Sequence, residues 1–290
     1  MRCDLHVHSV HSGPNTLAPL RAFCRECYSP PWELYGRLRV RGMDLVTVTD
    51  HDSIAAAGDL GGRFDFFLSE EVTCRLPSGA EAHLAVYDIT ARQHTGLQER
   101  RDDFSRLAAY LREERLFAAV NHIGSGLTGR RHAQDFDLLL AATPALETRN
   151  GQVPAANNRL AHALARRSGK IGLGGSDAHG LAGAGRAWTV VPGACNREEF
   201  LTGLRAGKAR AGGRHGAFWP LTLGILEIAL GLATECPVAA ALLPTLVFAP
   251  LAAAAHQVSE RLWARHWRKR LLQASSGTAC ALAGADPFAA

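Results

Sequence analysis

The chain has 290 residues, of which 47% are hydrophobic and 20% are charged. This length and composition exclude a disordered protein and allow one domain of α/β-barrel size, or a large core with a smaller appendage. The formal net charge of +5 is mild and does not by itself indicate a nucleic-acid partner. The seven cysteines are not spaced as a disulfide framework, and residues 1–12 lack a signal-peptide pattern, so we expect a cytoplasmic protein.

The chain opens with two histidines that would share one face of a strand. Side chains two residues apart in a strand point the same way, so His6 and His8 would present two imidazoles to one point. Two such ligands form a metal chelate, which needs further ligands from distant parts of the chain.

Apolar, strand-like runs then alternate with helical patterns. We expect strands at 44–48, 64–67, 82–89, 116–120, 145–146, 171–173 and 187–191, and helices at 32–41, 98–114, 155–168 and 197–207. This alternation favours a parallel sheet or barrel, in which the carboxyl ends of the strands build the active site.

Histidines and carboxylates lie at or near the ends of these runs. The groups are Thr49-Asp50-His51-Asp52, Glu70-Glu71, Glu81-Ala82-His83, Asn121-His122 and Ser176-Asp177-Ala178-His179. Imidazole and carboxylate ligands without paired cysteines suit Zn, Mn or Fe, and their number predicts a cluster of two or three divalent ions. Such a cluster activates water and polarises a phosphoryl oxygen, which indicates phosphoester hydrolysis. The histidines outside these groups and outside the opening segment with His6, His8 and His11 are interpreted as ordinary core or surface residues: His94, His132, His162, His215, His256 and His266.

The ordered set of motifs over residues 1–212 resembles the PHP (polymerase and histidinol phosphatase) superfamily of metal-dependent phosphoesterases. The resemblance implies an α/β fold, a distorted (β/α)7 barrel, with a di- or trinuclear metal centre. Its implied ligands are His6, His8 and Asp177 for one ion, Glu71 as the bridge to a second ion, His83 and His122 for that ion, and His51, His179 and His11 for a third. Glu71 is preferred to Glu70 as the bridge because Glu71-Val72-Thr73 matches the motif, and strand alternation lets only one of the two face the site.

Glu71, Asp177 and His179 are the residues that we expect to be essential for catalysis. Arg75, Arg130 and Arg149 follow strand-end motifs and are candidates for binding a substrate phosphate, although solvated loop arginines would follow the same pattern. The expected substrate is a small phosphorylated molecule, such as a nucleotide or sugar phosphate, or a short oligonucleotide.

Two other functions fit the same motifs. One is an amidohydrolase or deaminase, which also opens with an HxH strand but often needs a bridging lysine before its later histidines; Lys170 precedes only His179. The other is a non-catalytic, metal-binding PHP scaffold module.

Residues 213–290 differ in composition and are expected to form a hydrophobic and basic helical appendage that adds nothing to the chemistry. Residues 217–233 carry one charge, 237–255 carry none, and 261–270 are basic and aromatic. These features fit a membrane hairpin with both ends in the cytoplasm, or a helix lying on an anionic surface through Trp263, Trp267 and Leu271. Helices packed on the barrel or across a dimer interface would fit equally well.

Overall fold

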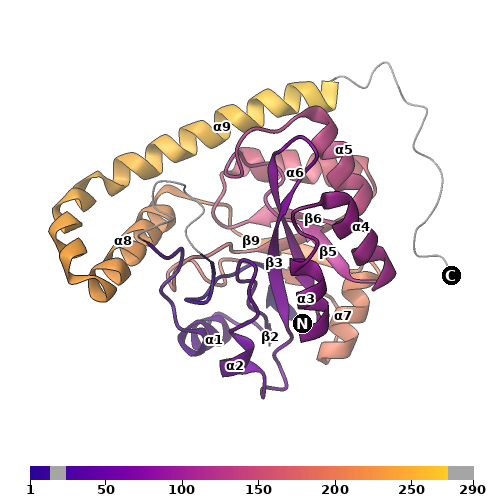
Figure 1. The fold of residues 1–290 in the computed structure, drawn as a ribbon, viewed down its shortest axis with the longest axis horizontal. Helices are drawn as coiled ribbons and strands as arrows, with labels where there is room; N and C mark the ends of the chain where they lie inside the picture. The colour runs from indigo at the N-terminus through magenta and orange to yellow at the C-terminus, as the bar shows by residue number, and fades with distance from the viewer. Residues whose placement is uncertain (14–23, 274–290) are drawn as a thin grey trace.

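A computed structural model describes residues 1–13 and 24–273 and shows a mixed α/β protein (Figure 1). In chain order its elements are β1 (Arg2–Asp4), α1 (Pro31–Val40), β2 (Leu45–Val46), α2 (Ala57–Leu60), β3 (Ser69–Arg75), β4 (Glu81–Tyr87), α3 (Ala91–Gln98), α4 (Phe104–Glu113), β5 (Phe117–Val120), α5 (Ala133–Ala142), β6 (Ala145–Asn150), α6 (Ala155–Arg167), β7 (Ile171–Gly175), β8 (Ala187–Val190), α7 (Arg197–Arg205), β9 (Arg210–Gly213), α8 (Phe218–Glu235), the 3₁₀ segment η1 (Pro237–Phe248) and α9 (Ala249–Gln273).

The strands of the described residues fall into two sheets, in the orders β3-β4-β5-β6-β7 and β2-β1-β8-β9. The pairs β5-β6, β6-β7 and β1-β2 are parallel, but β3-β4 and β4-β5 are antiparallel. The expectation of a parallel arrangement therefore holds for β1-β2, β5-β6 and β6-β7 but not for the pairs that β4 makes. The connection between β3 and β4 spans only residues 76–80, too short for the crossover that a parallel pair needs, so these strands form a hairpin.

Isolated bridges connect the two sheets. Val7 pairs with Ala178, just beyond the ends of β1 and β7, and Val46 of β2 pairs with Phe66 ahead of β3. A third bridge joins His51 to Glu71. The carboxyl ends of β1, β2 and β7 and the middle of β3 are thereby held together, and this is where the predicted ligands gather.

Two predicted elements differ in the structure. The expected helix 98–114 begins only at Phe104, as α4, because Asp103 caps its start by accepting from the backbone N–H groups of Ser105 and Arg106. The expected strand 64–67 is reduced to the single bridge at Phe66, and Glu71 lies inside β3 rather than after a strand.

The largest apolar cluster lies between the β3–β7 sheet and helices α4, α5 and α6. Leu107 and Leu111, one helical turn apart on α4, are buried against Val86 and Ala118 of the sheet. Burying a leucine completely, as at Leu107, stabilises the fold by about 1.5–3 kcal/mol. The cluster fixes the strands whose ends carry the site.

The C-terminal helices lie along one side of the molecule. In Figure 1, α9 runs across the top and joins α8 through the orange turn at the left edge. Trp263 and Trp267 of α9 pack on Phe136 of α5. The ring centroid of Phe136 lies 6.2 Å from that of Trp263 and 4.8 Å from that of Trp267, and Trp267 is buried. The proposed lipid-facing role of Trp263, Trp267 and Leu271 is therefore wrong, since this aromatic stripe covers the apolar core. Residues 274–290 of the predicted appendage lie outside the described residues.

Candidate metal centre

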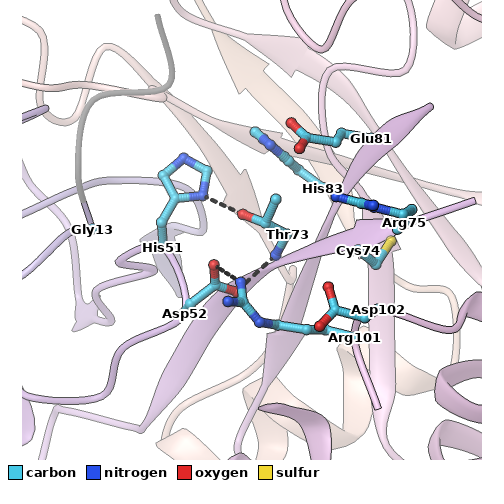
Figure 2. Close-up of a pocket in the computed structure, with 10 residues that line it drawn as sticks. All are labelled: Gly13, His51, Asp52, Thr73, Cys74, Arg75, Glu81, His83, Arg101 and Asp102. Carbon is cyan, nitrogen blue, oxygen red and sulfur yellow. Dashed lines mark hydrogen bonds and ion pairs between the residues drawn. The ribbon is translucent and has the colours of Figure 1, made fainter. Parts of the chain in front are cut away.

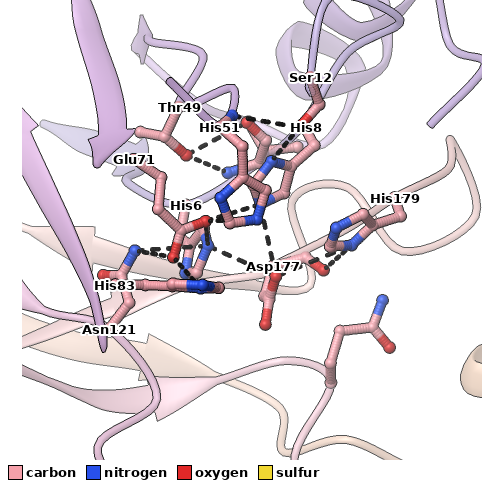
Figure 3. A network of polar contacts seen from close by, with 12 residues as sticks. His6, His8, Ser12, Thr49, His51, Glu71, His83, Asn121, Asp177 and His179 are labelled. Carbon is pink, nitrogen blue, oxygen red and sulfur yellow. Dashed lines mark hydrogen bonds and ion pairs between the residues drawn. The ribbon is translucent and has the colours of Figure 1, made fainter. Parts of the chain in front are cut away.

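Five of the predicted histidine ligands surround one carboxylate, that of Glu71 (Figure 3). Its Oε2 lies 3.0 Å from Nε2 of His6 and 3.3 Å from Nε2 of both His8 and His51. Its Oε1 lies 3.3 Å from Nδ1 of His83 and from Nε2 of His122. The two oxygens of one side chain therefore face different sets of imidazoles, which is the arrangement of a bridging carboxylate.

The antiparallel hairpin explains how His83 reaches this place although it lies near the start of β4. Leu84 is paired with Val120, the last residue of β5, so the beginning of β4 lies beside the end of β5. His83 and His122 thus meet at the same edge of the sheet, with ring centroids 5.1 Å apart.

Asp177 supplies the second inward carboxylate. Its Oδ1 lies 3.4 Å from Nε2 of His6 and 3.5 Å from Nε2 of His8. Four sets of side chains place their ligand atoms within 4.8 Å of one another: His6-His8-Asp177, His6-Glu71-His122, His51-Glu71-His83 and His8-His51-His179. The sets share members, so the site is one continuous cluster rather than separate binding points.

Neighbouring groups fix the orientation of the imidazoles from behind. Nδ1 of His6 lies 2.9 Å from Oε1 of Glu147, and Nδ1 of His8 lies 3.1 Å from Oγ of Ser12. Nδ1 of His179 lies 3.0 Å from the carbonyl oxygen of Asp177. With Nδ1 engaged outside, Nε2 of each of these rings is directed into the cluster, as in most histidine metal sites.

The backbone near the site adopts unusual conformations. His122 and Asp177 have positive φ angles of 29° and 53°, a region that non-glycine residues rarely occupy. Gly175 approaches the segment after β1 so closely that a Cβ there would lie 2.3 Å from Cβ of His6. Asp4 holds the same junction, since its Oδ1 accepts hydrogen bonds from the backbone N–H groups of Ser176 and His6 at 2.7 and 3.2 Å.

Mutual attraction keeps the buried cluster charged. Burial would raise the pKa of Glu71 and of Asp177, but the surrounding histidines, His6 foremost, hold both pKa values well below the usual range. Burial would likewise lower the pKa of His8, but Asp177 and Glu71 raise it to about 10. At His51 burial prevails and lowers the pKa to about 3, so this ring is neutral and free to act as a ligand.

The donor set fits divalent metal ions. Nε2 of His8 and Nδ1 of His83 are buried and have no hydrogen-bond partner among residues 1–13 and 24–273, although each lies 3.3 Å from a Glu71 oxygen. Two ligands bound about 2.1 Å from one tetrahedral ion would be ~3.4 Å apart, which matches this spacing. These residues fit a shared multinuclear site of imidazole and carboxylate ligands.

His11, the remaining predicted ligand, lies away from the cluster. Its Nε2 is 3.4 Å from Asp59, and it belongs to none of the four sets of ligand atoms. The structure instead brings in Glu26, which the sequence interpretation did not single out. Its Oε1 lies 3.1 Å from Nε2 of His179 and its Oε2 lies 3.5 Å from Nε2 of His51. His51 and His179 hold the pKa of this buried carboxyl well below its usual range, against the effect of burial.

Glu70 faces away from the cluster, as strand alternation requires. Its Oε2 lies 2.9 Å from Nδ1 of His94 and accepts a hydrogen bond from Gln98 at 2.8 Å. His94, interpreted from the sequence as an ordinary histidine, thus belongs to a polar network behind β3.

A pocket of about 250 Å³ opens beside the cluster (Figure 2). Its lining residues are Gly13, His51, Asp52, Thr73, Cys74, Arg75, Glu81, His83, Arg101 and Asp102. Of the three arginines expected to bind substrate, only Arg75 lines it. Arg130 is exposed, and Arg149 hydrogen-bonds His215 at 2.7 Å. Arg101, which the sequence did not single out, enters the pocket and forms an ion pair with Asp52.

Comparisons with known proteins agree with the fold and the motifs. Residues 155–209 match the family described as PHP-associated. PsfC from Pseudomonas syringae has a similar structure, with a TM-score of 0.52 at 18% identity over 81% of this chain and 98% of that one. A two-domain protein from Bacteroides vulgatus containing a predicted PHP-like metal-dependent phosphoesterase gives a TM-score of 0.50 at 18% identity over 79% of this chain and 70% of that one. No curated protein sequence matches the chain significantly. The chain thus has the fold of this PHP-like structure, and its residues 155–209 carry the match to the PHP-associated family.

Proposed function

We propose that the chain is a metal-dependent phosphoesterase. The observation that supports this proposal is the Glu71 carboxylate, whose two oxygens face His6, His8 and His51 on one side and His83 and His122 on the other. A carboxylate shared in this way suits ions held a few ångströms apart, the spacing that serves phosphoryl chemistry.

Three ion positions account for the ligands. The first ion would be held by His6, His8 and Asp177. The second would be held by Glu71, His83 and His122. The third would be held by His51, His179 and Glu26. When bound, the ions polarise a phosphoryl oxygen and lower the pKa of a water molecule. His179 is the most exposed of these imidazoles, at 19%, so we assign it to the side from which the substrate arrives. Mn, Zn and Fe all suit this donor set.

The pocket supports a small phosphorylated substrate. About 250 Å³ is slightly below the usual range for small-molecule sites, which favours a nucleotide or sugar phosphate over an oligonucleotide. We assign Arg75 to the phosphate, since its guanidinium can bind two phosphate oxygens and it has no ion-pair partner among the described residues. Arg101, already paired with Asp52, would hold that wall of the pocket in place.

The position of Lys170 argues against an amidohydrolase. Lys170 immediately precedes β7, whereas Asp177 and His179 follow the other end of that strand. The lysine is thus one strand length away from the cluster and cannot bridge ions there.

We infer in addition that β1–β7 form the distorted barrel that the sequence resemblance implied. The bridges Val7–Ala178 and Val46–Phe66 support this inference, because they connect β7 to β1 and β2 to the segment before β3. With the hydrogen-bonded pairs from β3 to β7 and from β1 to β2, they complete a ring of seven strands.

A phosphatase panel on metal-reconstituted protein tests the proposal. We expect turnover of at least one small phosphomonoester or phosphodiester with Mn, Zn or Fe, and loss of turnover on chelation. Elemental analysis should find more than one ion per chain. One ion or fewer per active chain would contradict the shared site, and hydrolysis of amides but no phosphoester would contradict the reaction.

A further inference from the structure

The appendage formed by α8, η1 and α9 exposes an unusual amount of apolar surface. Among the described residues, fourteen large apolar side chains are exposed, and nine of them lie between residues 219 and 262. Val238 and Val247 in η1 are 83% and 70% exposed, and Phe248 is 61% exposed. Exposed apolar side chains that gather in one segment mark a contact surface rather than scattered surface residues.

The acidic side chains of the appendage all contact the catalytic domain. Between residues 214 and 273 the sequence contains three carboxylates, Glu227, Glu235 and Glu260. Glu227 accepts from the backbone N–H of Ala182 at 3.1 Å, and Glu235 pairs with Arg25 at 2.8 Å. Buried Glu260 accepts from the backbone N–H of Gly126 at 3.0 Å and from Asn157 at 2.7 Å. The remaining charged side chains of the appendage are all basic.

The face of α9 opposite the domain changes from apolar to basic along the helix. The docked face carries Ala253, Gln257, Glu260, Ala264 and Trp267, all buried. The opposite, exposed stripe consists of side chains spaced three and four residues apart: Leu251, Ala255, Val258, Leu262, Arg265 and Lys269. An apolar surface that ends in lysine and arginine complements a membrane interface, where hydrocarbon lies beneath anionic headgroups.

We propose that this outer surface binds an anionic phospholipid membrane. The lipid-facing patch consists of Val238, Val247, Phe248, Leu251, Val258 and Leu262, which enter the acyl boundary, and Arg265 and Lys269, which contact lipid phosphates. In Figure 1 the orange turn between α8 and α9 extends at the left edge, away from the sheets, so a flat surface can reach it.

The binding is peripheral rather than membrane-spanning. By length and composition α8 is the single candidate span in the described part of the chain, with a mean hydropathy of 1.3. Its 18 residues extend about 27 Å, slightly less than a bilayer core of about 30 Å. Spanning would also pull Glu227 from Ala182 into hydrocarbon, which is costly, whereas peripheral binding leaves this hydrogen bond intact.

Vesicle flotation of the full chain tests the proposal. We expect it to bind phosphatidylcholine vesicles containing about one-third phosphatidylserine, and to bind pure phosphatidylcholine weakly. The double variant Arg265→Glu/Lys269→Glu should bind the mixed vesicles on the order of thirtyfold less or weaker still, at roughly fivefold per lost cation. Phe248→Ser/Leu251→Ser should weaken binding to both kinds of vesicle.

The matched control is Arg106→Glu/Arg112→Glu, which makes the same change in net charge at two exposed positions of α4. It should bind as the wild type does, and all variants should keep the wild-type melting temperature. Three results would overturn the proposal: no binding to the mixed vesicles, equal loss in the α4 variant, or a lipid-free dimer that Phe248→Ser/Leu251→Ser separates into monomers that bind no vesicles. None of these results depends on phosphatase activity.

Discussion

The carboxylate of Glu147 lies 2.9 Å from Nδ1 of His6, while Glu71 lies 3.0 Å from Nε2 of the same ring. A carboxylate behind a ligating imidazole raises its basicity and fixes its direction. Glu147→Gln should therefore lower metal affinity or activity by about 10- to 100-fold without unfolding the protein. Metal titration followed by steady-state kinetics measures this, with exposed Glu113→Gln as the control. Unchanged affinity would show that Glu147 only packs against the ring.

Glu71 and Asp177 should be indispensable for turnover. Either substitution by alanine removes a carboxylate that faces several imidazoles, so we expect no measurable activity and fewer bound ions. His162→Ala, on the exposed side of α6, should retain nearly full activity. Equal loss in Asp177→Ala and His162→Ala would show that the division between ligand and bystander histidines is wrong. Circular dichroism of each variant would check that it is folded.

Glu70 should make the metal-free protein less stable as the pH rises. Burial, and secondarily the charge of Asp52, raises the pKa of Glu70 to about 8 from the usual 4.5. Because the folded state binds this proton more tightly than the unfolded state, the free energy of unfolding falls between about pH 4.5 and pH 8, by at most about 1.4 kcal/mol per pH unit.

Glu70→Gln should remove that contribution. The difference in free energy of unfolding between variant and wild type should then shift in favour of the variant across the same pH range. Urea denaturation at several pH values measures it, and exposed Glu198→Gln serves as the control. A difference that does not change with pH would mean that Glu70 titrates at its ordinary value in the folded protein.

Arg75 should act on substrate binding rather than on the chemical step. A hydrogen bond from a charged group contributes about 1.5–3 kcal/mol, so Arg75→Ala should raise KM by roughly 10- to 100-fold with a smaller change in kcat. Arg130→Ala, which changes an exposed arginine outside the pocket lining, should leave both constants near the wild-type values. If Arg130→Ala raised KM and Arg75→Ala left it unchanged, the substrate phosphate would have to bind at the loop around Arg130 instead.

Strand periodicity explains why much of the site could be predicted from the sequence. The two-residue repeat places His6 and His8 on one face and separates Glu71 from Glu70, and the structure has both arrangements. Glu26 could not be found in this way, because it lies in no periodic element and reaches His179 only through the folded path of the chain. Glu147 follows an apolar run, but its distance from His6 in the sequence hides their contact.

The β3–β4 hairpin was missed for a different reason. An apolar run indicates a buried strand but not its direction, and direction depends on the length of the connection. The late start of α4 depends on one side chain, Asp103, whose capping contacts compete with a helix that begins at residue 98.

The contacts of Glu227 and Glu260 make the C-terminal helices difficult to remove. Glu227 accepts a hydrogen bond from the backbone N–H of Ala182, in the loop that follows His179. Glu260 accepts one from the backbone N–H of Gly126, in the loop that follows His122. Ending the chain at Gly213 would leave both amides without these acceptors and expose the apolar surface beneath Trp267. A protein shortened for convenience of purification would therefore have loosened loops next to two histidines of the candidate metal centre, so the appendage is an integral part of the folded unit rather than a detachable anchor.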